Sequence, residues 1–252
     1  MNIMPIMSTC LVILRLFYLF YFWLQLHRQQ MPDQVSSPPP ATSNPKDQNS
    51  GDSVAESKAE AASAEPGSLV KHPLQNKWAL WYFKNDRSKN WDDNLKIVAK
   101  FQFVEDFWAL YNHIQPASRL QTGCDYSLFK DGIRPAWEDQ RNKLGGRWLL
   151  TLNKQQRSEE LDAFWLETLL CLIGEAFEEY GDDICGATIN VRGKADKLAI
   201  WTADVENKEA VMAIGRKLKA RLGVPAKTII GYEPHDEAMA RKSSMAKTKY
   251  SV

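Results

Sequence analysis

Flat aromatic rings and isolated charges lie near predicted turns of this sequence, and together they could bind a planar ligand. Trp91 follows the polar stretch NDRSKN, and the pair Trp137-Glu138 comes two residues after Pro135. A tryptophan in a loop can stack on a planar base, and a neighbouring carboxylate can accept hydrogen bonds from the edge of that base. The alternative is that both rings are half-buried loop residues packed on the core, and the local pattern leaves both interpretations open.

Three basic residues lie at the ends of predicted strands. Arg147 begins one strand, Arg192 ends another, and Lys197 opens the next. Such cations can hold phosphates, although ordinary solvated turn and hairpin charges have the same pattern. The formal net charge is +1 and the pI is about 7.6, which argues against non-specific binding of long nucleic acid. Any nucleic-acid contact should therefore be small and local.

Motifs for catalysis and metal binding are absent from the sequence. There is no Walker A loop, no G-x-S-x-G and no H-E-x-x-H, and the four histidines have no obvious acid or nucleophile partner in sequence. The four cysteines are scattered without a C-x-x-C pair, which is typical of reduced, buried thiols in a cytosolic protein. We therefore expect no enzymatic activity, no metal and no cofactor.

The elements that must position these residues form an α+β pattern. A link from Gly193 to Asp196 joins two strands as a hairpin, which predicts antiparallel pairing. Strands are predicted over 77–84, 126–130, 147–152, 186–192, 197–203 and 228–232. Helices are predicted over 104–114, about 159–178 and about 207–222. The last helix has Asn207 as its N-cap and ends at Gly223. We expect a curved antiparallel sheet with its helices on one face.

Two segments lie outside this pattern. The apolar stretch 10–26 has the length of a short membrane-spanning helix, but Arg15 interrupts it at a cost of about 2.5–3.5 kcal/mol. Residues 1–30 are therefore either a membrane anchor that leaves the rest in the cytosol, or an upstream-start extension before Met31. Residues 31–70 are poor in large apolar side chains and should be disordered. Residues 71–252 are the folded domain, with a mobile tail after His235.

Within this domain, several stretches resemble a known protein family. The stretches CDYSLFKDGIRPAWED, NKLGGRWLLTLNKQQRS, FWLETLLCLIGEAF and DDICGATINVRGKADKLAIWT resemble the eukaryotic translation initiation factor 4E family, which binds the mRNA cap. The resemblance extends from about His72 to the C-terminus. It implies a cupped antiparallel sheet of about eight strands, with three helices on its convex face and 7-methylguanosine on its concave face.

The resemblance also implies roles for single residues. Trp91 and Trp137 match the two stacking rings, as in the two-Trp translation-type class, and Glu138 matches the acid that binds guanine. Trp201 matches the ring near the N7-methyl group. The phosphate contacts of the family match Arg147, Arg192 and Lys197.

A second surface is implied on the helices. Its groove receives a Y-x-x-x-x-L-apolar helix from the initiation scaffold factor or from 4E-binding repressor proteins, with this chain as a monomer in the complex. Core packing is the alternative for its apolar members. The matching residues are His72, Pro73, Val104, Trp108, Leu166, Glu167 and Leu170.

Three departures from the family pattern stand out. Gln102-Phe103 replaces a common Asp-Thr before the helix at Val104, which removes an N-cap. Arg241 stands where a lysine is common, and the apolar N-terminus has no counterpart. Ser244 matches a regulatory phosphorylation position.

Three functions follow as hypotheses. The first is a cap-binding initiation factor in the cytoplasm, with the nucleus as a further compartment. The second is a membrane-tethered or repressive cap-binding paralogue that does not support initiation. The third is a scaffold that binds a partner helix and no nucleotide, which Trp91, Trp137 and Glu138 argue against.

Overall fold

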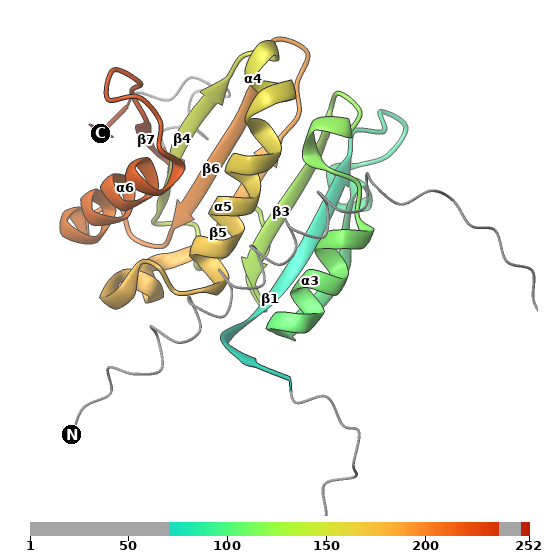
Figure 1. Cartoon of the computed structure of the whole chain (residues 1–252), viewed down its shortest axis with the longest axis horizontal. Coiled ribbons are helices and arrows are strands. Elements are labelled where there is room, and N and C mark those ends of the chain that lie inside the picture. The colour runs from blue at the N-terminus through green and yellow to red at the C-terminus, as the bar shows by residue number, and fades with distance from the viewer. Residues whose placement is uncertain (1–70, 237–247) are drawn as a thin grey trace, which may run out of the picture. The chain divides into compact units, whose positions relative to one another are not determined.

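The computed structural model describes residues 71–236 and 248–252 of the chain (Figure 1). The apolar stretch 10–26, the low-complexity segment 31–70, Arg241 and Ser244 lie outside the described residues. Within the described ranges, no helix combines the length and the apolarity that crossing a membrane requires.

The described domain is built on one sheet of eight strands. Their order across the sheet is β2-β1-β3-β5-β6-β4-β7-β8, and every neighbouring pair is antiparallel. This confirms the predicted fold class. The strands are β1 (Pro73–Lys84), β2 (Leu95–Phe103), β3 (Cys124–Lys130), β4 (Gly146–Leu152), β5 (Ile184–Asn190), β6 (Asp196–Thr202), β7 (Gly231–Pro234) and β8 (Tyr250–Ser251).

The longer helices lie on one face of this sheet (Figure 1). They are α3 (Val104–His113), α5 (Leu161–Ile173) and α6 (Lys208–Leu222). The shorter ones are α2 (Trp91–Asn94), α4 (Lys154–Glu159) and the 3₁₀ turns η1 (Ala117–Arg119) and η2 (Glu178–Asp183). Both predicted ends of α6 are confirmed: the Asn207 side chain accepts from the Ala210 N–H, and Gly223 caps the C-terminus at φ +62°.

Strand β4 shows how the two faces of the sheet differ. Trp148 is fully buried under α6, and its indole N–H donates to the Val211 carbonyl at 2.8 Å. Gly215 permits this close approach, since a Cβ there would lie 2.3 Å from the Trp148 ring. Side chains alternate along a strand, so Arg147 lies on the opposite face. We call the face opposite α3, α5 and α6 the open face.

The start of α3 lacks a side-chain cap, as the sequence predicts. Phe103 occupies the N-cap position and makes no capping hydrogen bond. The beginning of β1 compensates: the Val104 N–H donates to the His72 carbonyl at 2.9 Å, and the His72 N–H donates to the Glu105 carboxylate. Partial burial acts to raise the pKa of Glu105, but the bonds from His72 outweigh it and hold that pKa below its usual value.

Several predicted boundaries are wrong. The helix expected over about 159–178 is α5 alone, which ends at Ile173, and a separate short helix, α4, begins before it at the capping box of Asn153. The chain then turns at Glu175, whose φ is +51°. Strand β2 was not predicted. It is an edge strand with Ile97 and Val98 both exposed, so it lacks the alternation that indicates a strand.

The structure also changes the predicted surroundings of Trp91 and the predicted position of the last strand. Trp91 was expected in a loop but begins the four-residue helix α2, where the Asn90 side chain accepts from the Asp93 N–H at 2.8 Å. The last predicted strand, 228–232, is displaced toward the C-terminus and becomes β7.

Candidate functional site

Three of the predicted ligand-binding side chains, Lys197, Trp201 and Arg147, lie on two rows of cross-strand neighbours on the open face. One row runs across the sheet through Phe83, Asp125, Asn190, Lys197 and Thr151. The other runs through Phe129, Gly186, Trp201, Arg147 and Glu233. The rows are four residues apart along each strand, or about 13 Å. Lys197 therefore lies toward one end of the strands and Arg147 toward the other.

Arg147 is held by a buried acid. Its Nη2 and Nε donate to Glu233 Oε2 at 2.9 and 3.2 Å, and both residues are buried. A guanidinium has five N–H groups, so this pair leaves others for a second acceptor. Glu233 thus fixes the orientation of Arg147 without using all of its donors.

Arg192 is held in the same way at the other row. Its Nη1 and Nη2 donate to the two carboxylate oxygens of Asp125, the second at 2.9 Å. The hydrogen bond to Asp125 raises the pKa of Arg192, so the guanidinium stays charged. Its side chain remains 41% exposed, which leaves it accessible to an anion.

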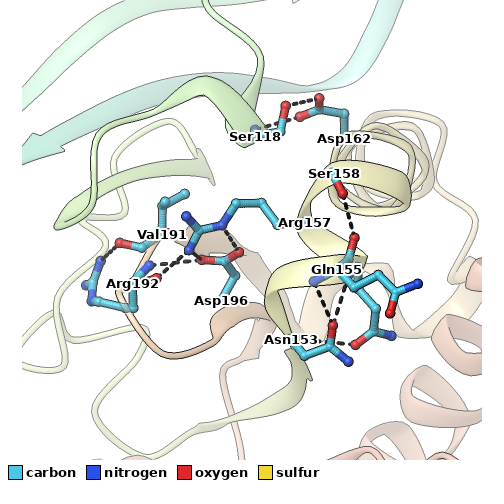
Figure 2. A network of polar contacts seen from close by, with 10 residues as sticks. Ser118, Asn153, Gln155, Arg157, Ser158, Asp162, Val191, Arg192 and Asp196 are labelled. Atoms are coloured by element: carbon cyan, nitrogen blue, oxygen red, sulfur yellow. Dashed lines mark hydrogen bonds and ion pairs between the residues drawn. The ribbon is translucent and has the colours of Figure 1, made fainter.

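A third ion pair clamps the hairpin that carries Arg192 and Lys197 (Figure 2). Asp196, which is fully buried, accepts from Arg157 Nε and Nη2 at 2.5 and 2.6 Å and from the Arg192 backbone N–H at 2.9 Å. Arg157 of α4 also donates to the Arg192 carbonyl. Both ends of the turn are thereby tied to the helix.

The pKa of Lys197 reflects its closeness to Arg147 and Arg192. Burial lowers the pKa of its ammonium, and the positive charges of Arg147 and Arg192 lower it further, against an opposing effect of Glu233. Like charges that depress one another in this way favour a bound anion. The fold thus brings Arg147, Arg192 and Lys197 into one electrostatic neighbourhood.

Sequence reasoning missed the residues that hold these cations. Glu233, Asp125 and Asp196 lie 86, 67 and 39 positions from their arginine partners, and Arg157 reaches the hairpin from α4. No local pattern in the sequence distinguishes these acids from solvated ones, because only the fold makes them neighbours of an arginine.

Two of the predicted rings belong to one apolar cluster on the open face. Trp201 is only 4% exposed and packs edge-on against Phe129, with ring centres 5.5 Å apart. Half-buried Trp137 packs against the same cluster. The His235 ring, which sequence reasoning did not single out, lies 4.2 Å from that of Trp201. Trp201 is therefore a wall of the site, while Trp137 keeps part of its ring open.

The other ring and the predicted acid are more accessible. Trp91 is 45% exposed and its ring centre lies 6.1 Å from that of Phe83, which is on the first row. Glu138 is exposed, and its carboxylate has no hydrogen bond or ion pair within the part of the chain that the structure describes. An apolar face and an unused carboxylate are what a hydrogen-bonding planar ligand requires.

The loop that presents Trp137 and Glu138 is ordered from within. Fully buried Asn142 donates through Nδ2 to the Arg134 and Ala136 carbonyls, at 2.8 and 2.7 Å. Asp139 accepts from the Arg134 and Arg141 N–H groups, each at 2.9 Å. These bonds give residues 134–142 a defined shape.

Comparison with known proteins assigns this architecture to a family. The model of the family described as Eukaryotic initiation factor 4E matches residues 73–250. Eukaryotic translation initiation factor 4E of Homo sapiens is 58% identical over 221 residues, which is 88% of this chain and 98% of that protein. The chain belongs to the eukaryotic initiation factor 4E family. This family is one of translation factors and not of enzymes, in agreement with the absence of catalytic motifs.

Solved structures of initiation factor 4E proteins have the same fold. One is a complex of C. elegans eIF4E-3 with the 4E-binding protein Mextli and a cap analog, at a TM-score of 0.68 and 49% identity. It aligns with 73% of this chain and 100% of that chain. Another is Ascaris suum eIF4E-3 with the m7G cap, at a TM-score of 0.68 and 52% identity, over 73% and 98%.

The residues that the initiation factor 4E resemblance assigns to a partner groove lie on the helix-covered face or at its edge. His72 and exposed Pro73 adjoin the start of α3 through the His72–Val104 backbone bond. Glu167 of α5 pairs with Arg221 Nη2 at 2.6 Å. Val104 is fully buried, and the remaining members expose less than a tenth of their surface: Trp108, Leu166 and Leu170.

Proposed function

We propose that this chain binds the 7-methylguanosine cap of mRNA on its open face and recruits a scaffold factor to start cap-dependent translation. The observation that carries the proposal is a juxtaposition. The exposed ring of Trp91 is linked through Arg134 to the loop of half-open Trp137 and the unused carboxylate of Glu138. The same open face carries two arginines anchored by acids, Arg147 and Arg192. Rings, acid and cations match the three parts of a cap: a charged purine, its hydrogen-bonding edge and its phosphate chain.

Methylation of guanine at N7 gives the purine a positive charge. Trp91 and Trp137 would then hold it by cation–π attraction, worth about 2 kcal/mol or more for a desolvated face. Glu138 would accept from the adjacent N1–H and N2–H donors of guanine in charge-assisted bonds. Adenine has an acceptor at N1 and would leave the acid unsatisfied. The rings therefore select the methylated base, and Glu138 selects guanine.

The phosphate chain would lie against Arg147, Arg192 and Lys197. Arg147 and Arg192 are oriented by Glu233 and Asp125, and each has guanidinium donors left for phosphate oxygens. A bound anion would raise the pKa of Lys197 by offsetting its two cationic neighbours, although burial would still lower it. Only a short chain needs neutralising, which fits the net charge of +1.

Relatives support both halves of the proposal. The Ascaris suum structure is a complex of eIF4E-3 with the m7G cap. The C. elegans structure is a complex of eIF4E-3 with a cap analog and the 4E-binding protein Mextli. With both stacking positions occupied by tryptophan, we place this chain in the two-Trp translation-type class. We also place it in the cytoplasm, where translation occurs, with Ser244 as a phosphorylation site.

The test is a tryptophan fluorescence titration of the full chain with 7-methyl-GTP and with GTP. We expect the methylated nucleotide to bind at least about 30-fold more tightly, the equivalent of one cation–π face. Equal affinity for the two nucleotides would falsify cap recognition.

For the partner surface, we propose that the helix face near His72 and Trp108 receives the amphipathic helix of a scaffold or repressor protein. Trp108→Ala should lose a peptide carrying the Y-x-x-x-x-L-apolar motif while keeping 7-methyl-GTP. Loss of both ligands would identify Trp108 as a core residue and remove it from the groove.

A repressive or tethered cap-binding paralogue is the second candidate, and the apolar stretch 10–26 is the observation that favours it. Fractionation of the full chain against one starting at Met31, together with rescue of translation in an extract depleted of its own cap-binding factor, separates the two. A chain that binds 7-methyl-GTP but gives no rescue is the paralogue.

A further inference from the structure

Arg134 connects the two segments that carry the proposed stacking rings. Its Nη2 forms an ion pair with Asp92 Oδ1, and Asp92 directly follows Trp91 in α2. The Arg134 Cζ atom also lies 5.8 Å from the centre of the Trp91 ring. Arg134 itself belongs to the loop that presents Trp137 and Glu138, three positions before Trp137. One side chain thus touches the segment of one ring from the loop of the other.

Each end of this contact is anchored in its own segment. On the loop side, the Arg134 N–H donates to Asp139 and its carbonyl accepts from buried Asn142. On the other side, Asn90 caps α2, and Asn94 donates to the Asp86 carbonyl at 2.9 Å. Within the described ranges, Arg134–Asp92 is the only hydrogen bond or ion pair between residues 85–94 and 131–142.

The exposure of the pair limits what it can do for stability. The side chains of Arg134 and Asp92 are 50% and 69% exposed, and exposed ion pairs contribute little to folding. A four-residue helix is far shorter than one that is stable by itself, so the position of Trp91 depends on the contacts around α2. A contact that fixes a ring before the ligand arrives lowers the cost of ordering that ring on binding.

We propose that Arg134 and Asp92 are a positioning pair that sets the spacing of Trp91 and Trp137 in the unliganded protein. The inference rests on the proposed cap-binding function. Neither residue needs to touch the ligand. The pair raises the fraction of unliganded molecules in which the two rings have the spacing that binding needs, and so it raises affinity. Recognition of the base remains with the rings and with Glu138.

The direction of the affinity change caused by one substitution, Asp92→Asn, separates this role from simple charge attraction. The cap is anionic through its phosphates, so removal of the negative charge of Asp92 should strengthen binding if only long-range electrostatics mattered. Loss of the positioning contact should weaken it. Asp93 supplies the matched control, since its exposed carboxylate has no hydrogen bond or ion pair in the described part of the chain.

The experiment measures 7-methyl-GTP and GTP affinities for the full chain, Asp92→Asn, Arg134→Gln, Asp93→Asn and the exchanged pair Asp92→Arg with Arg134→Asp. We expect Asp92→Asn and Arg134→Gln each to weaken both nucleotides by about two- to fivefold, the range of an exposed ion pair. The preference for 7-methyl-GTP stays within about twofold of the original in either variant. The exchanged pair should recover the original affinity, and Asp93→Asn should not lose any.

A readout without ligand completes the test. Amide hydrogen exchange at residues 93–94 should be faster in Asp92→Asn and Arg134→Gln than in the original chain, and unchanged in Asp93→Asn. The midpoint of global unfolding should be unchanged in all three variants. Unchanged or tighter binding by Asp92→Asn overturns the positioning role, and so does an exchanged pair that fails to recover. A full chain with no preference for 7-methyl-GTP removes the proposed function instead, so the two failures are distinguishable.

Discussion

The two halves of the open face are built on different physical terms. The cationic half consists of Arg147 and Arg192 on or beside strands, each with an acidic partner, and of a hairpin tied to Arg157 through fully buried Asp196. The aromatic half consists of Trp91 on a four-residue helix and of Trp137 and Glu138 on a loop. In the first half the charged groups are fixed before any ligand arrives. In the second, exposed groups depend on a few surface contacts.

This difference shows which half stabilises the fold and which discriminates between ligands. An ion pair with a buried member couples a binding residue to folding, because removing one partner leaves the buried charge without compensation. Exposed rings and an unused carboxylate contribute little to folding, so they can be specialised for the ligand. Substitutions in the cationic half should therefore mainly lower the stability of the fold, and substitutions in the aromatic half should mainly lower the affinity for the ligand.

The largest expected effect breaks the cationic half. Asp196→Ala removes the acceptor of Arg157 and of the Arg192 N–H, and should lower the free energy of unfolding by about 3–5 kcal/mol. Urea denaturation followed by circular dichroism measures it. The exposed acid Asp182 is the control, and Asp182→Ala should stay within about 0.5 kcal/mol. A loss below about 1 kcal/mol in Asp196→Ala would mean that the clamp does not stabilise the domain.

The next effect isolates the aromatic half. Glu138→Ala should weaken 7-methyl-GTP binding by about 1.5–3 kcal/mol, or about ten- to hundredfold, because two charge-assisted hydrogen bonds are lost. Its free energy of unfolding should not change, since the carboxylate is exposed without a partner in the described structure. Calorimetric titration and urea denaturation on the same preparation check both. A variant that binds as tightly as the original chain would remove Glu138 from base recognition.

A pH effect sharpens the boundary between the halves. The His235 ring packs against that of Trp201, and burial, aided by the charge of Arg147, lowers its pKa to about 3. His235 therefore stays neutral at mild acidity in the folded state, whereas in the unfolded state it takes up a proton below about pH 6.5. Stability should therefore fall as the pH drops, by about 2 kcal/mol near pH 5 from this residue alone.

His235→Phe should lose that part of the pH dependence, and exposed His113→Gln should retain it. Denaturation midpoints between about pH 5 and pH 7 make the comparison. If the slope in His235→Phe equals that of the original chain, His235 is not the group that couples acid to unfolding.

Local signals explain what could be predicted of the fold. Asn207 and Gly223 delimited α6 correctly because an N-cap and a left-handed C-cap act within a few residues. The link at Gly193 predicted the β5–β6 hairpin for the same reason. Strand β2 escaped prediction because an edge strand with Ile97 and Val98 both exposed has no clear alternation.

The sequence by itself determined which chemical groups are present and, through its resemblance to a family, which of them could meet a ligand. Trp91, Trp137, Glu138, Arg147, Arg192 and Lys197 could all be named in advance. Only the tertiary structure decided what holds them. Antiparallel pairing brings Glu233 to Arg147 and Asp125 to Arg192, and Arg134 reaches from its loop to Asp92 of α2. Such contacts join residues far apart in the chain, and no local pattern of charge or hydrophobicity specifies them.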